Sequence, residues 1–417
     1  MKQIKIEGNH LLTGTVEISG AKNSAVALIP AALLSDGIVT IDNVPNISDI
    51  DALDEILAFL GADVVRNGKT IKIDSKNIIN KEIPENISSK LRASYYFMAS
   101  LLAKYKKVEM YFPGGCNIGS RPIDQTLKSF KLLGAKIVED NNKYTITADE
   151  LIGNDIYLDM PSVGATINAM IVATKAKGKT KIYNAAKEPE IVSIATFLNQ
   201  MGAHILGAGT NRIEIIGVEK LSGCFTEVIP DRIEAGTYLI AGALIGNNLR
   251  VENLIPEHIK SLTSKLREMG VPLNIGEDYI EVSKAENLNA VKIKTLGYPG
   301  FPTDLQQPMT VLLTQATGKS ILEETIYENR FNNVKYLNDM GSDIIIDNKK
   351  IIINGPSKLT SRIVEATDLR AGACMVLAAL IADGITTITS VEHVLRGYEN
   401  IIEKLTNIGA KIKLEDI

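Results

Sequence analysis

The sequence predicts an α/β protein built from six copies of one structural unit. Three observations support this prediction. A glycine after an apolar, helix-like ending recurs about every 70 residues, a short hairpin pattern follows it, and a small-residue helix, a strand and a second amphipathic helix precede it. Strands that alternate with helices are typical of α/β proteins. At 417 residues the chain exceeds one ordinary core, so we expect at least two domains.

Each unit is expected to run strand, helix, strand, helix, hairpin. Glycine suits the left-handed position just after a helix. The six recurring glycines are Gly61, Gly134, Gly202, Gly270, Gly341 and Gly409. In the first unit, residues 63–74 form a hairpin pattern around Asn67-Gly68, a favoured two-residue turn. The small-residue helices are predicted to begin near Lys22, Arg92, Ser162, Asp231, Asp304 and Asp368. The strands after them are predicted at 39–41, 108–110, 181–183, 249–251, 320–322 and 386–388.

The two ends of the chain indicate how the units are grouped. The sixth unit stops after one hairpin strand at 410–414, and residues 2–6 resemble the second hairpin strand at 69–73. We therefore expect the N-terminal strand to close the last unit. This predicts one discontinuous domain of residues 1–20 plus 230–417 and a second domain of residues 21–229. A chain that crosses twice between domains favours a cleft between them.

Composition excludes several function classes. The chain is 45% hydrophobic and 23% charged with a net charge of -4, so we expect no nucleic-acid partner. Its longest apolar runs fall short of the roughly 18 residues that indicate a membrane span. We therefore expect a cytoplasmic protein without a membrane partner. The three cysteines form no CxxC pair and the four histidines show no ligand spacing, so no metal site is predicted. The oligomeric state stays open, and a monomer fits the sequence.

Polar residues gather where the small-residue helices begin. Helix N-termini offer free N–H groups and the positive end of the helix dipole, which suit anions. Six such ends facing one cleft favour a small polyanionic ligand, although six repeats could also form only a structural array. Lys22-Asn23 stands at the first helix start, where a cation opposes the dipole unless an anion binds. The alternative is a capping pair with a solvated lysine.

The segment at 112–124 carries the strongest local signal. Three glycines surround Cys116, and Arg121 follows closely enough in sequence to favour a thiolate. The alternative is a glycine-rich turn with an incidental cysteine. Cys374 is predicted to lie in the core, and Cys224 has no assigned role.

Aspartate and arginine residues recur at equivalent repeat positions. Asp304 opens the fifth small-residue helix as Asp231 and Asp368 open the fourth and sixth, and an N-cap is the simplest interpretation of each. Arginine binds carboxylate and phosphate in a bidentate manner. Several arginines at repeat positions indicate a shared anion, and they are Arg330, Arg370 and Arg396.

Nine ordered motifs resemble the UDP-N-acetylglucosamine 1-carboxyvinyltransferase family of enolpyruvyl transferases. The resemblance runs from end to end. The motifs are Gly20-Ala21-Lys22-Asn23, Pro113-Gly114-Gly115-Cys116, Arg121-Pro122-Ile123-Asp124, Ser162-Val163-Gly164-Ala165-Thr166, Pro230-Asp231-Arg232-Ile233-Glu234, Phe301-Pro302-Thr303-Asp304, Glu328-Asn329-Arg330-Phe331, Ala366-Thr367-Asp368-Leu369-Arg370 and Arg396-Gly397-Tyr398-Glu399.

The resemblance implies a fold and an activity. The fold would be two inside-out α/β domains of three repeated units each, with a cleft between them. The substrates would be phosphoenolpyruvate and UDP-N-acetylglucosamine, and the products 3-enolpyruvyl-UDP-N-acetylglucosamine and phosphate. This reaction is the first committed step of peptidoglycan synthesis, and the family uses no metal or organic cofactor.

The resemblance also implies roles for individual residues. Lys22, Arg121 and Arg396 would hold phosphoenolpyruvate, with Asn23 orienting the reacting groups. Cys116 would donate the proton, form the covalent adduct and react with fosfomycin, and Asp304 would contact the sugar hydroxyl as base. The residues expected to line the nucleotide-sugar site are Asn23, Arg92, Arg121, Pro122, Ile123, Asp124, Gln125, Ser162, Val163, Gly164, Asp304 and Ile326. Those expected to support the cleft are Arg330, Asp368 and Arg370.

Two departures from the family pattern concern the nucleotide. Thr126 stands where many members have histidine, and Met160 stands where some have lysine. Nucleotide affinity is therefore where this chain is expected to differ.

Three other functions are alternatives to this one. 5-Enolpyruvylshikimate-3-phosphate synthase shares the fold and the donor, but the Cys116 loop and Arg121-Pro122 argue against it. A catalytically silent regulatory paralogue is disfavoured by the intact Lys22, Cys116, Asp304 and Arg396. An RNA-end-processing enzyme on a related repeat would need a basic surface and a placed catalytic histidine.

Overall fold

The computed structural model describes residues 2–114 and 122–416. Cys116 and Arg121 lie outside the described residues. The described chain divides into two compact units. One unit contains residues 20–114 and 122–229, and the other contains residues 2–19 and 230–416. Each unit has a hydrophobic core of its own.

In the 20–229 unit, the described residues form three sheets with strand orders β13-β3-β5-β4, β6-β8-β7 and β11-β12-β10-β9. The strands are β3 Val39–Asp42, β4 Asp63–Asn67, β5 Thr70–Asp74, β6 Lys107–Tyr111, β7 Lys136–Asp140, β8 Lys143–Thr147, β9 Asp155–Tyr157, β10 Lys179–Tyr183, β11 His204–Leu206, β12 Arg212–Ile216 and β13 Phe225–Glu227. The helices are α1 Lys22–Ala31, α2 Ser48–Leu60, α3 Glu85–Ser88, α4 Tyr96–Tyr105, α5 Asp124–Leu132, α6 Val163–Ala173 and α7 Pro189–Gln200, with 3-10 turns η1 Ala32–Leu34 and η2 Arg92–Tyr95.

In the other unit, the described residues also form three sheets, with strand orders β21-β22-β1-β23, β15-β16-β14-β2 and β17-β18-β20-β19. The strands are β1 Lys2–Glu7, β2 Thr15–Glu17, β14 Leu249–Glu252, β15 Leu273–Ile275, β16 Tyr279–Val282, β17 Lys292–Lys294, β18 Gly318–Glu323, β19 Asp343–Asp347, β20 Lys350–Gly355, β21 Ile363–Glu365, β22 Ile385–Thr389 and β23 Lys411–Asp416. The helices are α8 Arg232–Ile245, α9 Lys260–Glu268, α10 Gln306–Leu313, α11 Asn333–Asp339, α12 Leu369–Ile381, α13 Glu392–Leu395 and α14 Ile401–Asn407, with 3-10 turns η3 Pro256–Ile259 and η4 Thr303–Leu305.

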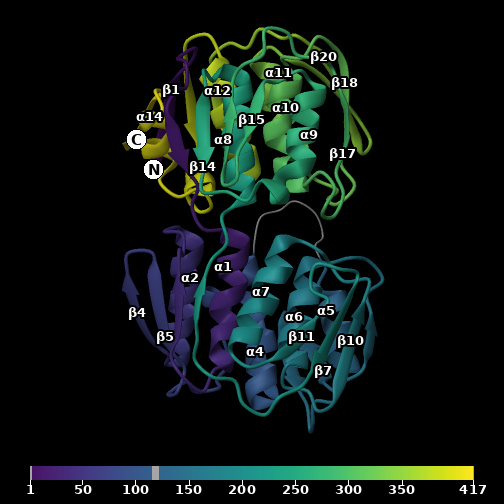
Figure 1. The fold of residues 1–417 in the computed structure, drawn as a ribbon. Helices are drawn as coiled ribbons and strands as arrows, with labels where there is room; N and C mark the ends of the chain where they lie inside the picture. Colours follow the sequence, from purple (N-terminus) through teal and green to yellow (C-terminus); the bar gives the residue numbers. More distant parts are fainter. Residues whose placement is uncertain (1, 115–121, 417) are drawn as a thin grey trace. The chain divides into compact units, whose positions relative to one another are not determined.

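The small-residue helices form the interior of each unit. In the 230–416 unit, α8, α10 and α12 pack against one another, and α12 is buried from Leu369 to Leu380. In the 20–229 unit, α4 packs against both α1 and α6, and all three are largely buried. Figure 1 shows these helices inside each unit, with strands on the outside. Small side chains allow such close helix contacts. The predicted α/β fold class is thus confirmed.

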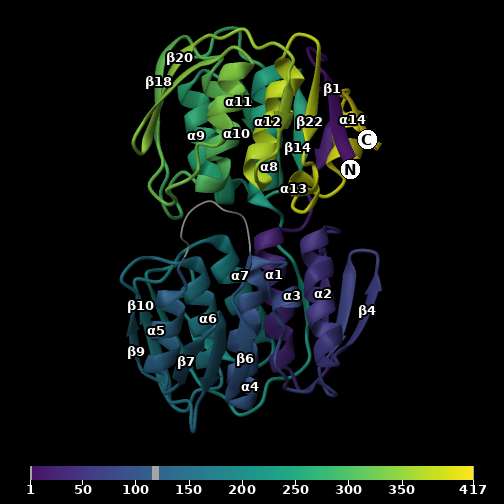
Figure 2. The same ribbon diagram turned by 180° about the vertical axis from the view of Figure 1, so that it is seen from behind.

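The N-terminal strand completes a sheet at the other end of the sequence. β1 pairs antiparallel with both β22 and β23, so that Ile4 lies opposite Ile388 on one side and Leu414 on the other. Figure 2 shows β1 between these C-terminal elements. Ile4 and Ile6 are fully buried, because alternate residues of a strand face the core.

The prediction of a left-handed glycine after a helix in each repeat is confirmed. All six recurring glycines have a positive φ, between 88° at Gly61 and 112° at Gly341. The helices expected near Arg92 and Asp304 begin with the 3-10 turns η2 and η4, and the α-helices follow from Tyr96 and Gln306. Among the described residues, no helix combines the length and apolar character that a membrane crossing needs.

Candidate active site

In the 20–229 unit, Lys22 is the first residue of α1 and is held by a buried carboxylate. Its Nζ lies 2.5 Å from Oδ2 of Asp49, in the first turn of α2, and the two side chains are 13% and 5% exposed. Ala21 provides no side-chain cap for α1. The alternative of a solvated lysine is therefore wrong. Asn23 follows Lys22 and is half-buried.

The start of α6 lies against the segment that contains Arg92. Ser162 caps α6 by accepting a hydrogen bond from the Ala165 backbone N–H over 3.3 Å. A Cβ on Gly164 would lie 1.5 Å from the Tyr95 hydroxyl oxygen, so any larger residue there would displace the Tyr95 side chain. The Arg92 guanidinium donates to the Pro113 carbonyl over 3.4 Å. Val163 is half-buried in the same turn. The structure thus brings Arg92 and residues 162–164 together.

Gln125, at the start of α5, connects this helix to Asp159 through hydrogen bonds. Its Nε2 donates to Asp124 Oδ2 over 2.8 Å and to Asp159 Oδ2 over 3.0 Å, and its Oε1 accepts from the Asp159 backbone N–H over 2.9 Å. Gln125 is buried, whereas Asp124 and Pro122 are exposed. The amide of Gln125 is thus engaged by the protein, which suits a residue that positions residues 122–124.

The two departures from the family pattern differ in accessibility. Thr126 is only 2% exposed, whereas Met160 is 61% exposed. Ile123 is buried beside Thr126. Thr126 therefore presents no hydroxyl to solvent, and Met160 presents an apolar side chain there.

In the 230–416 unit, Asp304 lies in η4 and is held by two arginines. Arg330 Nη2 donates to Oδ1 over 2.7 Å and Arg370 Nη2 donates to Oδ2 over 3.1 Å. Arg330 and Arg370 are only 3% and 5% exposed. Burial by itself would raise the pKa of Asp304, but the Arg370 and Arg330 guanidiniums outweigh burial and hold that pKa well below its usual range.

Asp304 does not cap a helix, although the equivalent aspartates do. Asp231 Oδ1 accepts from the Ile233 and Glu234 backbone N–H groups, and Asp368 Oδ1 accepts from those of Arg370 and Ala371. Asp304 makes no side-chain capping bond. The N-cap prediction is confirmed for Asp231 and Asp368 and is wrong for Asp304, because Asp304 turns toward the arginines instead.

Arg396 and Ile326 lie in connecting segments of the same unit. Arg396 follows α13 and is half-buried. Ile326 follows β18 and is 40% exposed, and its backbone N–H donates to Glu324 Oε1 over 2.8 Å. Tyr398, two residues after Arg396, is buried and accepts a hydrogen bond from Arg370 Nη1 over 3.2 Å. Sequence reasoning missed Asp49 and Tyr398 as partners of the candidate residues. The only sequence signal for Tyr398 was its place in the motif Arg396-Gly397-Tyr398-Glu399.

The two described cysteines are poor nucleophiles. Burial raises the pKa of the Cys224 thiol to about 11 and that of the Cys374 thiol to about 12. The core prediction for Cys374 is confirmed. Among residues 2–114 and 122–416, no group of three or more histidine, cysteine or acidic side chains has the arrangement of a metal site.

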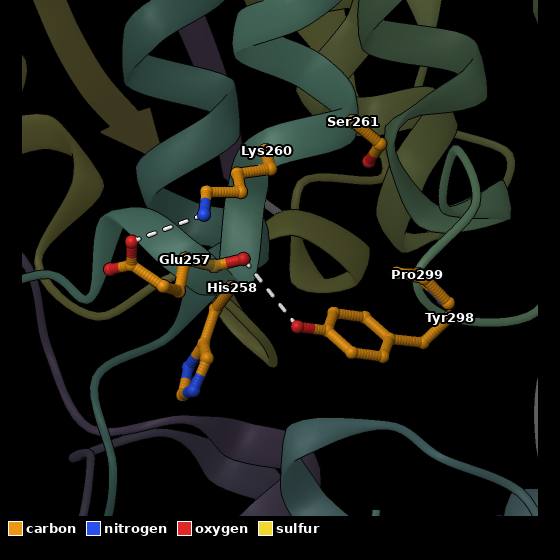
Figure 3. A pocket seen from close by; sticks show the side chains of 6 residues that line it. All are labelled: Glu257, His258, Lys260, Ser261, Tyr298 and Pro299. Carbon is orange, nitrogen blue, oxygen red and sulfur yellow. Dashed lines mark hydrogen bonds and ion pairs between the residues drawn. The ribbon is translucent and has the colours of Figure 1, made fainter. Parts of the chain in front are cut away.

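A pocket of about 190 Å³ that sequence reasoning did not predict lies in the 230–416 unit (Figure 3). Its lining residues are Glu257, His258, Lys260, Ser261, Tyr298 and Pro299. The Tyr298 hydroxyl donates to the Glu257 carbonyl over 3.4 Å, and Lys260 pairs with the Glu257 carboxylate over 3.3 Å. The Arg232 guanidinium lies 5.7 Å from the centre of the Tyr298 ring. Three of these lining residues, Glu257, Lys260 and Tyr298, thus already have protein partners.

Comparison with known proteins identifies the family. Residues 6–405 match the family described as EPSP synthase (3-phosphoshikimate 1-carboxyvinyltransferase). UDP-N-acetylglucosamine 1-carboxyvinyltransferase 2 of Geobacillus kaustophilus is 52% identical to this chain, and the match covers 99% of this chain and 96% of that enzyme. The crystal structure of the enolpyruvyl transferase NikO from Streptomyces tendae superposes with a TM-score of 0.90 at 26% identity, covering 99% of this chain and 98% of that one.

EPSP synthase from Acinetobacter baumannii superposes over 100% of both chains with a TM-score of 0.78 at 19% identity, which shows a shared fold. The family match covers nearly the whole sequence, and the 52% identity extends over nearly the whole of both chains. The chain belongs to the EPSP synthase family, the enolpyruvyl transferases.

Proposed function

We propose that this enzyme transfers the enolpyruvyl group of phosphoenolpyruvate to the 3-hydroxyl of UDP-N-acetylglucosamine and releases phosphate. The observation that carries the proposal is the 52% identity, over 99% of the chain, to a relative named for this reaction. The EPSP synthase structures are only 18–19% identical. The reaction is the first committed step of peptidoglycan synthesis, and we assign it to the cytoplasm.

The residue types support an addition followed by an elimination. Phosphoenolpyruvate carries a carboxylate and a phosphate, which Lys22, Arg121 and Arg396 would bind as cations. A proton delivered to its methylene carbon, the role proposed for Cys116, makes the adjacent carbon oxocarbenium-like. The sugar hydroxyl then adds to that carbon, and phosphate leaves as the methyl group returns a proton. Lys22 fits the binding role because Asp49 already fixes its ammonium group.

Asp304 fits the role of the group that receives the hydroxyl proton under one condition. Its arginine partners keep it ionised, so it can always accept a hydrogen bond from the hydroxyl. Its depressed pKa makes it a weak base toward a free hydroxyl. The same proton becomes strongly acidic once the oxygen has bonded to the cationic carbon. We therefore propose that Asp304 orients the hydroxyl first and accepts its proton late.

The nucleotide sugar is proposed to contact the segments that meet in the 20–229 unit. Arg92, residues 123–125 and residues 162–164 provide a guanidinium, backbone N–H groups and the first turn of α6, all of which suit a diphosphate. Arg121 and Pro122 are further proposed contacts, on the basis of the family resemblance. Asn23, Asp304 and Ile326 are the remaining proposed contacts. Gln125 would act by holding its neighbours, because its amide is already bonded to Asp124 and Asp159.

Phosphate release from phosphoenolpyruvate tests the proposal and separates its rivals. The enzyme should release phosphate with UDP-N-acetylglucosamine and not with shikimate 3-phosphate or with no acceptor. Turnover with shikimate 3-phosphate alone would identify an EPSP synthase. No turnover with either acceptor, in a protein whose folding is checked by circular dichroism, would identify a silent paralogue.

A further inference from the structure

The segment that carries Arg396 is held by two buried neighbours. Residues 396–400 connect α13 to α14. Tyr398 and Glu399 in this segment are only 2% and 4% exposed. A loop with two adjacent buried polar side chains can be fixed only if their polar groups find partners. Both side chains do find them, in two separate hydrogen-bond networks.

The first network runs from Asp304 through Tyr398 to helix α8. Arg370 donates from Nη2 to Asp304 over 3.1 Å and from Nη1 to the Tyr398 hydroxyl over 3.2 Å. The Tyr398 hydroxyl lies 2.9 Å from Thr237 Oγ1, and Thr237 donates to the Ile233 carbonyl over 2.9 Å.

The donors and acceptors of this first network can be assigned from the groups themselves. A guanidinium can only donate, so the Tyr398 oxygen accepts from Arg370 and its own O–H is free to donate to Thr237. The Thr237 hydrogen is already used on the Ile233 carbonyl. Every link therefore has one donor and one acceptor. Loss of the Tyr398 hydroxyl would leave Arg370 Nη1 without this acceptor and Thr237 Oγ1 without this donor.

The second network ties the next residue of the segment to the same helix. The Ser19 hydroxyl donates to Glu399 Oε2 over 2.5 Å, and the Ser19 backbone N–H donates to Glu234 Oε2 over 2.8 Å. Lys404 Nζ lies 2.7 Å from both the Ser19 hydroxyl and Glu234 Oε1. Glu234 and Thr237 lie three residues apart on α8, so they share one face of the helix. The Arg396 segment is thus anchored twice to that face.

We infer that Tyr398 is a positioning residue that couples Asp304 to the segment carrying Arg396. The inference rests on the proposed function, in which Asp304 meets the sugar hydroxyl and Arg396 binds phosphoenolpyruvate. The Tyr398 hydroxyl fixes the rotation of the Arg370 guanidinium, and that guanidinium fixes one oxygen of Asp304. The backbone of Tyr398 carries Arg396 two residues away. One hydroxyl therefore sets the position of groups that act on two different substrates.

The chain offers a matched control in Tyr238. Tyr238 also lies on α8 and is 2% exposed, but its hydroxyl has no hydrogen-bond partner among the described residues. Tyr398→Phe and Tyr238→Phe each remove one buried hydroxyl and keep the ring. Tyr398→Phe should lower kcat by about 10- to 100-fold, the range expected when a catalytic group shifts by about 1 Å. It should also raise KM for phosphoenolpyruvate several-fold, with KM for UDP-N-acetylglucosamine little changed. Tyr238→Phe should match the wild type.

Two measurements decide the inference. A Tyr398→Phe enzyme that melts at a lower temperature but keeps wild-type kcat and both KM values well below that temperature would show a purely structural role and overturn it. Crystal structures of the two variants provide a readout that does not depend on activity. Movement of the Arg370 guanidinium and residues 396–400 only in Tyr398→Phe supports the inference, and an unmoved segment overturns it. A wild type that turns over neither acceptor rejects the proposed function alone, because the crystal structures still test Tyr398.

Discussion

The two units hold their candidate catalytic charges in opposite ways. In the 20–229 unit, one ammonium group at Lys22 faces one buried carboxylate at Asp49. In the 230–416 unit, one carboxylate at Asp304 faces two buried guanidiniums at Arg330 and Arg370. The first contact joins one cation to one anion, and the second joins two cations to one anion. A charged group at a helix start is thus fixed by tertiary partners in both units.

Three aspartates at equivalent helix starts of the 230–416 unit differ in the same way. Asp231 and Asp368 cap α8 and α12, whereas Asp304 caps nothing and pairs with arginines. The repeats therefore keep the same residue type at equivalent positions while its use changes. The use of the aspartate changes at Asp304, where the buried side chains of Arg330 and Arg370 lie close enough to pair with it.

The largest expected effect is that of Asp304→Asn. This substitution removes a carboxylate that pairs with two buried guanidiniums, and breaking a buried ion pair costs about 3–5 kcal/mol of unfolding free energy. Turnover should also fall steeply, because an amide cannot accept the hydroxyl proton. Guanidinium chloride denaturation and phosphate release measure the two effects.

Asp231→Asn provides the control for this contrast. Asparagine caps helices about as well as aspartate, so the stability change should stay within about 1 kcal/mol. Equal losses of stability in the two variants would mean that Asp304 has no special electrostatic role.

The sequence predicted the repeat well, because its signals are local. A left-handed residue after a helix favours glycine whatever surrounds it, and all six glycines were found from spacing alone. The helices α1, α6 and α12, which the sequence predicted as small-residue helices, are largely buried.

Side-chain partners could not be predicted in the same way. Asp49 lies 27 residues after Lys22, and Tyr398 lies 94 residues after Asp304, so only the fold brings them together. Asp304 shows the cost of a local rule, because an aspartate before a helix is most simply interpreted as a cap. Propensity cannot distinguish a cap from a carboxylate held by distant arginines.

The second-largest expected effect is a difference in thiol reactivity between Cys116 and the two described cysteines, Cys224 and Cys374. Because burial raises the pKa of Cys224 to about 11 and of Cys374 to about 12, both are almost entirely protonated near neutral pH. We expect fosfomycin with UDP-N-acetylglucosamine to modify Cys116, and each described thiol to react more than about 100-fold more slowly than an ordinary thiol of pKa about 8.5.

Intact-mass analysis and peptide mapping locate the adduct. Cys116→Ser should lose both the adduct and most turnover, whereas Cys224→Ser should keep both. An adduct on Cys224 or Cys374 would reverse the assignment.

A smaller effect is expected for Asp49→Asn. The variant keeps an oxygen acceptor for Lys22 but removes the negative charge of Asp49, which costs about 1–3 kcal/mol. Lys22 should also lose its fixed position, so KM for phosphoenolpyruvate should rise several-fold. Steady-state kinetics and chemical denaturation measure both changes.

The control is Asp51→Asn in the same turn of α2. Asp51 is 63% exposed and pairs with Arg66 at the surface, so its loss should change stability by less than about 0.5 kcal/mol and leave KM unchanged. If Asp49→Asn also leaves KM for phosphoenolpyruvate unchanged, the presentation of Lys22 does not depend on its pair.

The smallest expected effect is that of Asp54→Asn in α2. It tests how well Arg66 compensates for the burial of the Asp54 carboxylate. Burial raises the pKa of Asp54 to about 6 from 3.8, against the opposing effect of Arg66 and with a further contribution from Asp51. The Arg66 contact is long, at 3.2 Å. Since the folded state binds this proton more tightly than the unfolded state, ionisation weakens the fold as pH rises from about 4 through about 6. Asp54→Asn removes this titrating carboxyl group.

The unfolding free energy of Asp54→Asn minus that of the wild type should therefore increase between pH 4 and pH 7, by about 1 kcal/mol after allowance for solvent screening. Asp149→Asn is the opposite-sign control. Its exposed carboxylate has a pKa lowered by the hydrogen bond from Lys136, so that difference should be flat or fall slightly over the same interval. Denaturation at each pH gives both curves. Parallel curves for Asp54→Asn and the wild type would mean that Arg66 compensates fully for the burial of Asp54.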